Sequence, residues 1–172
     1  MVANICRIKE GRFEVNGATW VECDGNLTGS EAFCRQFLRG KRYLRQKFGY
    51  ESDTFWLPDT FGYSAALPQI MKKSGVDYFL TTKLSWNDTN QFPYETFRWR
   101  GIDGSTVPVH FNSIHTWVNE ETVGARLDAI RNKRESDSVL IAYGFGDGGG
   151  GPSAEMVSRA IFTEKTAQRA RV

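Results

Sequence analysis

The chain has 172 residues, a length that fits one domain and would bury roughly 70% of the surface that the unfolded chain exposes. Hydrophobic residues make up 40% and charged residues 24%, and the net charge of +2 comes from 22 basic and 20 acidic residues that are interspersed. This balance is ordinary for a soluble globular protein, and it gives no reason to expect binding to nucleic acid or to a membrane. No apolar run approaches the ~20 residues of a membrane-spanning helix.

The first predicted elements are a strand and a long helix. A strand is predicted over residues 18–23, ending at the turn residues 24–26. A helix is predicted over residues 30–48, because its apolar side chains recur with a 3.6-residue period. Ser30 is placed to cap the start of this helix, and Gly49 suits its end.

The later predicted elements continue the alternation of strand and helix. They are a strand at 54–57, a helix from about Pro68 to Gly75, a strand at 76–84, a hairpin of 96–100 and 106–111, a helix capped by Asn119, a strand at 138–143 and a helix opened by Pro152. Strands and helices that alternate with short joins indicate an α/β fold with a mostly parallel sheet.

Ligands of parallel sheets bind beyond the carboxyl ends of the strands, where Asp24, Asp59 and Asp147 are predicted to lie. Asp59 directly follows the strand at 54–57, and Asp147 lies in a glycine-rich loop. Glycoside hydrolysis needs two carboxyl groups, so Asp59 and Asp147 are candidate catalytic residues. By position alone, both could equally be turn residues.

Aromatic and acidic residues near these positions are candidate sugar contacts. Trp56, Phe61 and Tyr63 flank Asp59 and are expected to bind substrate. Glu22 and Asp24 could hydrogen-bond sugar hydroxyl groups, or belong to a half-exposed strand and turn.

The cysteines and histidines match no metal-binding motif. Cys6, Cys23 and Cys34 are odd in number and match no paired-cysteine spacing, so we expect reduced thiols in a cytoplasmic protein. The N-terminus also lacks the apolar core of a signal peptide. His110 and His115 do not have the spacing of a helical zinc motif and are expected to be structural.

Several long motifs occur together and in a fixed order. They are WVECDGNLTGSEAFCRQFLRGKRYLRQKFG, FWLPDTFGYSAALPQIMKKSGVDYFLTTKLSWNDTNQFPYETFRWRGIDGSTVPVHF and AYGFGDGGGGP. Over about residues 10–160, the chain resembles the catalytic domain of glycoside hydrolase family 38, the class II α-mannosidases, in the cytosolic and bacterial branch with the DGGGGP loop.

The resemblance implies a retaining mechanism, a distorted seven-stranded barrel-like β/α domain, and a zinc ion that binds hydroxyls of the terminal mannose. Asp59 matches the aspartate that is both nucleophile and zinc ligand, and Asp147 matches the acid/base residue. Lys83 matches a basic position near the nucleophile that touches substrate. The substrate would be a mannose-containing oligosaccharide or glycoside, and the full-length enzyme could be a homo-oligomer.

The sequence also departs from the family pattern. It has no His-x-Asp pair and no histidine after the DGGGGP loop, so Asp59 is the only expected zinc ligand present. Residues 1–172 are therefore expected to be a partial catalytic domain that lacks its first and last parts. We expect the isolated chain to be inactive or nearly so, because catalytic zinc sites need three protein ligands or more.

Two other functions fit parts of the sequence. Residues 144–149 match GxGxxG after a strand and before a helix, as in dinucleotide-binding domains, but no second strand with an acidic end follows. A non-catalytic carbohydrate-binding α/β domain is the other alternative, marked by sugar affinity without hydrolysis.

Overall fold

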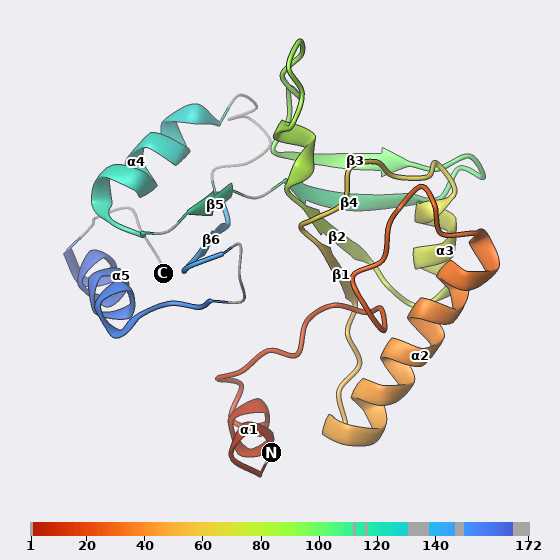
Figure 1. Cartoon of the computed structure of the whole chain (residues 1–172), viewed down its shortest axis with the longest axis horizontal. Helices are drawn as coiled ribbons and strands as arrows, with labels where there is room; N and C mark the ends of the chain where they lie inside the picture. Colours follow the sequence, from red (N-terminus) through yellow and green to blue (C-terminus); the bar gives the residue numbers. More distant parts are fainter. Residues whose placement is uncertain (1, 112, 116, 131–137, 147–149, 167–172) are drawn as a thin grey trace. The chain divides into compact units, whose positions relative to one another are not determined.

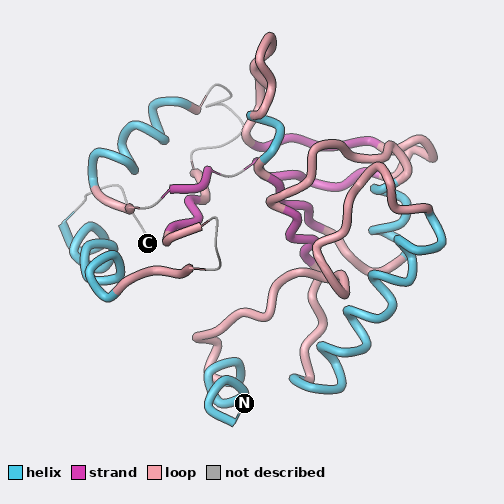
Figure 2. The backbone as a smooth tube through the Cα atoms, viewed as in Figure 1, coloured by secondary structure: helices cyan, strands magenta, loops and turns pink. Residues whose placement is uncertain are grey.

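The computed structural model describes residues 2–111, 113–115, 117–130, 138–146 and 150–166 (Figure 1). The chain forms two compact units, the first made of residues 1–91 and 97–110 and the second of residues 92–96 and 111–172. Helices and strands occur in both units, as the coloured tube in Figure 2 shows. The predicted α/β class is therefore confirmed.

The first unit is built on a four-stranded sheet. Its elements are α1 (Val2–Lys9), α2 (Ser30–Phe48), β1 (Thr54–Leu57), α3 (Leu67–Lys73), β2 (Tyr78–Thr81), the 3-10 turn η1 (Lys83–Ser85), β3 (Thr96–Arg100) and β4 (Thr106–Phe111). The strand order is β1-β2-β4-β3. β1 and β2 pair in parallel with Leu57 opposite Thr81, so both strands end at the same edge of the sheet.

The core of this unit lies between the sheet and helices α2 and α3. Successive side chains of a strand point to opposite faces, and on β1 it is Phe55 and Leu57 that are fully buried. The core cluster consists mainly of Phe33, Phe37, Phe55, Leu57, Leu67, Met71, Phe79, Val107 and Val109. The rings of Phe37 and Phe55 meet edge to face at 5.0 Å, which packs α2 directly on β1.

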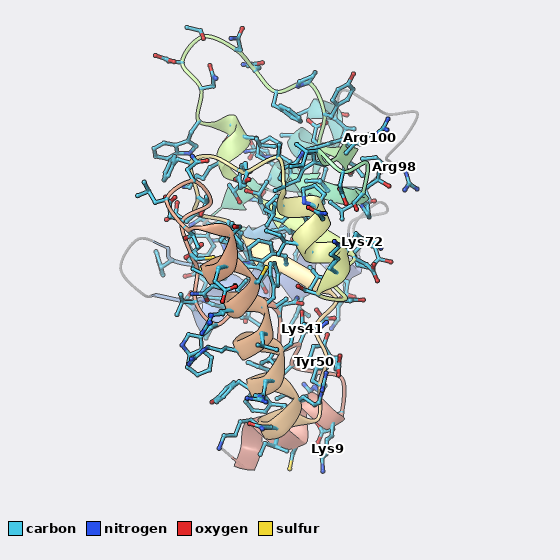
Figure 3. The ribbon with its side chains drawn as sticks, turned by 90° about the vertical axis from the view of Figure 1, so that its right-hand side faces the viewer. Lys9, Lys41, Tyr50, Lys72, Arg98 and Arg100 are labelled. Atoms are coloured by element: carbon cyan, nitrogen blue, oxygen red, sulfur yellow. The ribbon has the colours of Figure 1, made fainter. Side chains whose placement is uncertain are left out.

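Helix α2 has the predicted bounds, but a different residue occupies its N-cap. Gly29 occupies the N-cap and Ser30 is the first helical residue, so the predicted serine cap is wrong. At the other end Gly49 adopts the left-handed conformation with φ of 65°, and its N–H donates to the Arg45 carbonyl at 3.0 Å, as predicted. Lys41, labelled in Figure 3, donates to the carbonyls of Ser74 and Gly75 at 2.9 and 2.7 Å and ties α2 to the end of α3.

The second unit has a small sheet and two helices. Strands β5 (Ser113–His115) and β6 (Ile141–Tyr143) pair in parallel, and the helices are α4 (Glu120–Ala129) and α5 (Ala154–Thr166). Asn119 caps α4 as predicted, because its Oδ1 accepts the N–H of Thr122 at 2.8 Å. Ile130, Met156 and Ala160 are buried in this unit.

The strand predicted over residues 18–23 does not form. This segment is a loop that bends at residues 18–21, and the N–H groups of Trp20 and Val21 bond to helix α2 instead of to another strand. Trp20 donates to the Gln36 carbonyl and Val21 to the Gln36 Oε1, each at 3.0 Å. The prediction was wrong because an apolar run fits a strand only where a neighbouring strand accepts its N–H groups.

Other predicted elements differ mainly at their ends. The strand predicted at 76–84 is reduced to β2, because the chain turns into η1 after Thr81, and the strand predicted at 138–143 starts at Ile141. Helix α1 and strand β5 were not predicted.

Candidate active site

Asp59 lies two residues beyond the carboxyl end of β1, as the sequence predicts. The buried side chains of β1 anchor this strand in the core, so the residues that follow it start from a fixed point. The Asp59 side chain is 58% exposed. A carboxylate in this position is accessible to a ligand while its backbone is held by the sheet.

Lys83 reaches Asp59 from the turn that follows the neighbouring strand β2. It begins the turn η1 after β2, and the parallel pairing of β1 with β2 brings the two loops to one edge. Lys83 Nζ lies 3.1 Å from Asp59 Oδ1, and the lysine side chain is only 14% exposed. The ammonium group is thus held largely away from water and fixes one oxygen of the carboxylate.

Two aromatic rings enclose the Lys83 ammonium. Its nitrogen lies 4.4 Å from the centre of the Trp86 ring and 5.5 Å from that of Phe61. The two rings meet edge to face with their centres 5.5 Å apart. Cation–π contacts of this kind orient an ammonium group in addition to its ion pair.

Tyr63 makes its described contacts with the core. Its hydroxyl group is hydrogen-bonded to Thr81 Oγ1, and its ring packs against Phe79 at 5.4 Å and Trp99 at 6.3 Å. Burial raises the pKa of the Tyr63 hydroxyl above its usual value, the Thr81 bond lowers it, and the charge of Asp59 adds a smaller upward effect. Tyr63 therefore links the loop that follows Asp59 to the core.

Trp56 is partly buried on β1, between the core residues Phe55 and Leu57. Because side chains alternate along a strand, Trp56 belongs to the face opposite those two residues. Its proposed contact with substrate stays a prediction.

The loop at residues 23–28 packs closely against the loop that carries Asp59. Thr60 Oγ1 donates to the Cys23 carbonyl at 3.3 Å, and a Cβ atom at Gly25 would collide with the Gly62 carbonyl. Gly62 has φ of 152° and lies against the Asn26 side chain. Glycine at both positions is what lets the two backbones approach.

Asp24 acts as a turn residue in this loop. Its Oδ1 accepts the N–H groups of Asn26 at 2.7 Å and Leu27 at 2.6 Å. These bonds, that of Leu27 first, lower the pKa of the Asp24 carboxyl group. Glu22 is exposed in the same loop. Of the two functions that the sequence left open for Asp24, the turn is the one that these bonds support.

Asp147 lies outside the described residues. Beside it, Gly144 has φ of 129° and the Phe145 N–H donates to the Gly151 carbonyl at 3.2 Å. The role predicted for Asp147 as acid/base stays a prediction.

The described residues do not fit the zinc site that the family resemblance implies. Nowhere among them do three or more His, Cys, Asp or Glu side chains converge as metal ligands would. Asp59, the expected ligand, instead has one oxygen bound to the Lys83 ammonium, a cation that competes with a metal ion for the same atom.

Trp86 was missed by the sequence reasoning. A signal for it exists, because residues i and i+3 of a 3-10 turn lie one above the other. A lysine three residues before a tryptophan in such a turn favours a cation–π contact, as Lys83 and Trp86 form.

The family model for the glycosyl hydrolases family 38 N-terminal domain matches residues 6–172. The chain belongs to glycosyl hydrolase family 38. The resemblance inferred from the sequence motifs is therefore confirmed.

Curated relatives of this family 38 chain are named α-mannosidases. The chain is 46% identical over 168 residues to Alpha-mannosidase G of Dictyostelium discoideum, covering 94% of the chain and 16% of the relative. It is 49% identical over 152 residues to Alpha-mannosidase 2C1 of Homo sapiens, covering 87% and 15%. It is 44% identical over 158 residues to the α-mannosidase of Saccharomyces cerevisiae, covering 90% and 15%. The chain thus spans only about a sixth of the length of these relatives.

Solved structures share the fold. An α-mannosidase from Enterococcus faecalis V583 has a TM-score of 0.71 at 16% identity, covering 95% of this chain and 19% of that one. A 4-alpha-glucanotransferase from Thermococcus litoralis has a TM-score of 0.60 at 17% identity, covering 95% and 26%. At these identities the likeness concerns the fold alone.

Within the part of the chain that the structure describes, no helix combines the length and apolar character needed to cross a bilayer.

Proposed function

We propose that this family 38 chain carries the nucleophile of a retaining α-mannosidase that removes terminal α-mannosyl residues from oligosaccharides or glycosides. The observation that carries the proposal is the Asp59 carboxylate, which is exposed just beyond β1 and paired with Lys83, whose ammonium in turn contacts the Trp86 and Phe61 rings. The names of the relatives at 44–49% identity support the reaction and the sugar.

The proposed reaction has two steps. Lys83 binds Asp59 Oδ1, which leaves Oδ2 to attack the anomeric carbon of the mannosyl residue. Asp147 gives its proton to the leaving oxygen as that bond breaks, and a covalent glycosyl-enzyme forms. Asp147 then takes a proton from the water that attacks the anomeric carbon, and mannose leaves with its configuration retained.

Zinc, with Asp59 as one ligand, stays a proposal for the intact enzyme. The residues of this chain that the structure describes do not by themselves form a zinc site, and the steps above use none. We also propose that residues 1–172 form part of a larger seven-stranded barrel-like domain, and that the active enzyme is longer than this chain, which the share of the relatives' length supports.

We further propose a cytoplasmic location. All three cysteines are free, and Cys6 and Cys34 are exposed. Exposed thiols remain reduced in the cytosol and are readily oxidised outside it. Whether the full-length enzyme forms a homo-oligomer stays a prediction.

A carbohydrate-binding domain without catalytic activity is the second candidate. The exposed aromatic rings beside Asp59 would serve sugar binding even where no hydrolysis follows. Sugar affinity that is unaffected by loss of the Asp59 carboxylate would favour this function.

Trapping the covalent intermediate tests the proposed nucleophile. The matching segment of the Saccharomyces cerevisiae α-mannosidase is replaced by this chain, and the chimera is treated with a ring-fluorinated mannosyl fluoride, whose fluorine slows hydrolysis of the glycosyl-enzyme. We expect the peptide that contains Asp59 to gain the mass of one fluoromannosyl group, and an Asp59→Asn chimera to gain none. A label on a different carboxylate of the folded chimera would contradict the proposal.

A further inference from the structure

A long surface groove is lined by helices α2 and α3, which face the viewer in Figure 3. Its lining residues on α2 run from Ser30 to Gln46, which corresponds to roughly 24 Å of helix at about 1.5 Å per residue. Lys41 donates to the carbonyls of Ser74 and Gly75 and so fixes α2 against the end of α3. A ligand that fills this α2–α3 groove is therefore elongated, and it meets walls that are already in place.

The α2–α3 groove is strongly basic, although the net charge of the whole chain is only +2. The charged residues that line it are one carboxylate, Glu31, and the cations Arg35, Arg39, Lys41, Arg42, Arg45 and Lys73. Arg35 pairs with Glu31, and Arg45 pairs with Glu51. In the part of the chain that the structure describes, Arg39 and Arg42 form no ion pair. Two guanidinium groups about one helical turn apart are thus available to the carboxylates of a ligand.

The groove also has an apolar strip beside these cations. Leu38 is 64% exposed on α2, and Ile70 of α3 is a further lining residue. Residues four apart on a helix lie one above the other, so Cys34, Leu38 and Arg42 form one row on α2. A single exposed leucine on a helix needs no explanation, but a leucine within a groove, next to a cation, does. Its aliphatic surface suits an aliphatic side chain of a peptide.

We propose that the α2–α3 groove is a docking site for an acidic segment of a partner protein, which binds as an amphipathic helix. Its carboxylates pair with Arg39 and Arg42, and an apolar side chain of the same segment covers Leu38 and Ile70. The charge of the groove selects this occupant, because a second copy of the chain that docked through the same face would oppose like charges. Asp59 does not line the groove, so docking is a function separate from the proposed hydrolysis.

Binding of a designed peptide to the full 172-residue chain tests the docking site. The probe is a fluorescein-labelled helical peptide of glutamate and leucine, with the leucines along one face. We expect it to bind, and we expect Arg39→Gln combined with Arg42→Gln to lower its affinity about fivefold to tenfold, the factor for two exposed charge pairs. Lys9→Gln combined with Lys47→Gln is the matched control, because it removes the same charge from exposed positions outside the groove.

The reactivity of two cysteines locates the bound peptide. Cys34 and Cys6 are both exposed, but of the two only Cys34 lines the groove. The peptide should slow the alkylation of Cys34 by N-ethylmaleimide and leave that of Cys6 unchanged, as peptide mass spectrometry measures. No binding by the wild-type chain, equal affinities of the two double variants, or no protection of Cys34 would overturn the proposal.

Two further measurements distinguish other occupants of the groove. A peptide with glutamine in place of each leucine, or a single-stranded oligonucleotide, should bind more weakly than the probe. Equal binding of either would overturn the proposal, because the surface would then attract any polyanion. In the chimera with the Saccharomyces cerevisiae enzyme, Cys34 should react without unfolding. A Cys34 that reacts only in the unfolded chimera would also overturn the proposal, since the enzyme's own chain would then cover the groove.

Discussion

At the scale of single residues, Lys83 connects the groups around the candidate nucleophile. It begins the turn η1 after β2, its ammonium binds the Asp59 carboxylate, and the rings of Phe61 and Trp86 contact that ammonium. Exposed ion pairs are worth little to stability, but a mostly buried ammonium also has a positioning effect on its partner. We therefore expect Lys83 to matter more for activity than for folding.

Replacing Lys83 with methionine keeps most of the stem and removes the charge. We expect turnover of an aryl α-mannoside by the chimera to fall at least tenfold, while the free energy of unfolding changes by about 1 kcal/mol or less. Lys72→Met is the control, because Lys72 also pairs with an aspartate, Asp77, but on the surface of α3. Equal turnover in the two variants would show that the Lys83 ammonium does not assist the reaction.

The raised pKa of Tyr63 predicts that the stability of the chain depends on pH. Its pKa lies above the usual value of 10.0, chiefly because the hydroxyl is buried, so the folded state keeps the proton longer than the unfolded state. This contribution to stability is complete below pH 10.0 and is lost as the pH rises through the folded-state pKa.

In Tyr63→Phe the stability should fall less steeply than in the wild type as the pH rises from 10.0 through the folded-state pKa of Tyr63. At neutral pH the variant should be less stable by about 1 kcal/mol, because Thr81 loses a hydrogen-bond partner. Urea unfolding at neutral and alkaline pH measures both effects. Parallel curves for the two proteins would mean that Tyr63 ionises equally in the folded and unfolded states.

The sequence located Asp59 beyond a strand because a buried apolar run followed by Pro-Asp is a local pattern. It did not reveal the contacts of that aspartate, because Lys83 and Trp86 reach it only through the pairing of β1 with β2. Their positions made Asp59 and Asp147 catalytic candidates, and the family resemblance gave them the separate roles of nucleophile and acid/base. Trp56, Phe61 and Tyr63 were predicted as substrate contacts from their proximity to Asp59 in the sequence.

At the scale of elements, the loop at residues 18–20 lies directly on helix α2. Gly40 is buried in the middle of this helix, and a Cβ atom there would collide with backbone atoms of Ala18 and Thr19. The close approach allows the Trp20 N–H to bond to the Gln36 carbonyl. Glycine weakens a helix interior, so its presence here is explained by packing.

Gly40→Ala should therefore destabilise the chain. We expect the free energy of unfolding to fall by about 1–3 kcal/mol, because the loop backbone must move to make room for the Cβ atom. This cost exceeds the gain in helix propensity from replacing glycine with alanine. Gly124→Ala in α4 is the control, since a Cβ atom there meets nothing within 4 Å and should stabilise by about 0.5–1 kcal/mol. Thermal unfolding measures both changes, and a more stable Gly40→Ala chain would refute the close packing.

Elements with strong local signals were predicted with correct ends. The bounds of β1, β3 and β4 agree with the structure, because turn residues flank each apolar run. The segment 18–23 has a similar apolar run, but its hydrogen bonds depend on where α2 lies, which local sequence does not specify.

At the scale of the whole molecule, the chain belongs to family 38 but spans only part of the length of its curated relatives. The chain matches the family's N-terminal domain model over residues 6–172, yet spans 15–16% of the curated relatives. Completion of the seven-stranded barrel-like domain by further sequence remains part of the proposed function.

The purified chain should not bind zinc stoichiometrically. Among the residues described, Asp59 has no second metal-ligating side chain grouped with it as a site requires, and its Oδ1 is bound to Lys83. Titration calorimetry with zinc should give the same weak response for the wild type and for Asp59→Asn. One tightly bound zinc per chain that is lost in Asp59→Asn would show that the chain assembles the site after all.

The most direct test of the central claim is the hydrolysis of a chromogenic aryl α-mannoside by the chimera with aspartate or asparagine at position 59. If Asp59 is the nucleophile, Asp59→Asn should lower kcat at least roughly a thousandfold while the thermal unfolding of the chimera stays similar. Turnover by a folded Asp59→Asn chimera within tenfold of the unsubstituted one would contradict the account, and the nucleophile would have to be another residue.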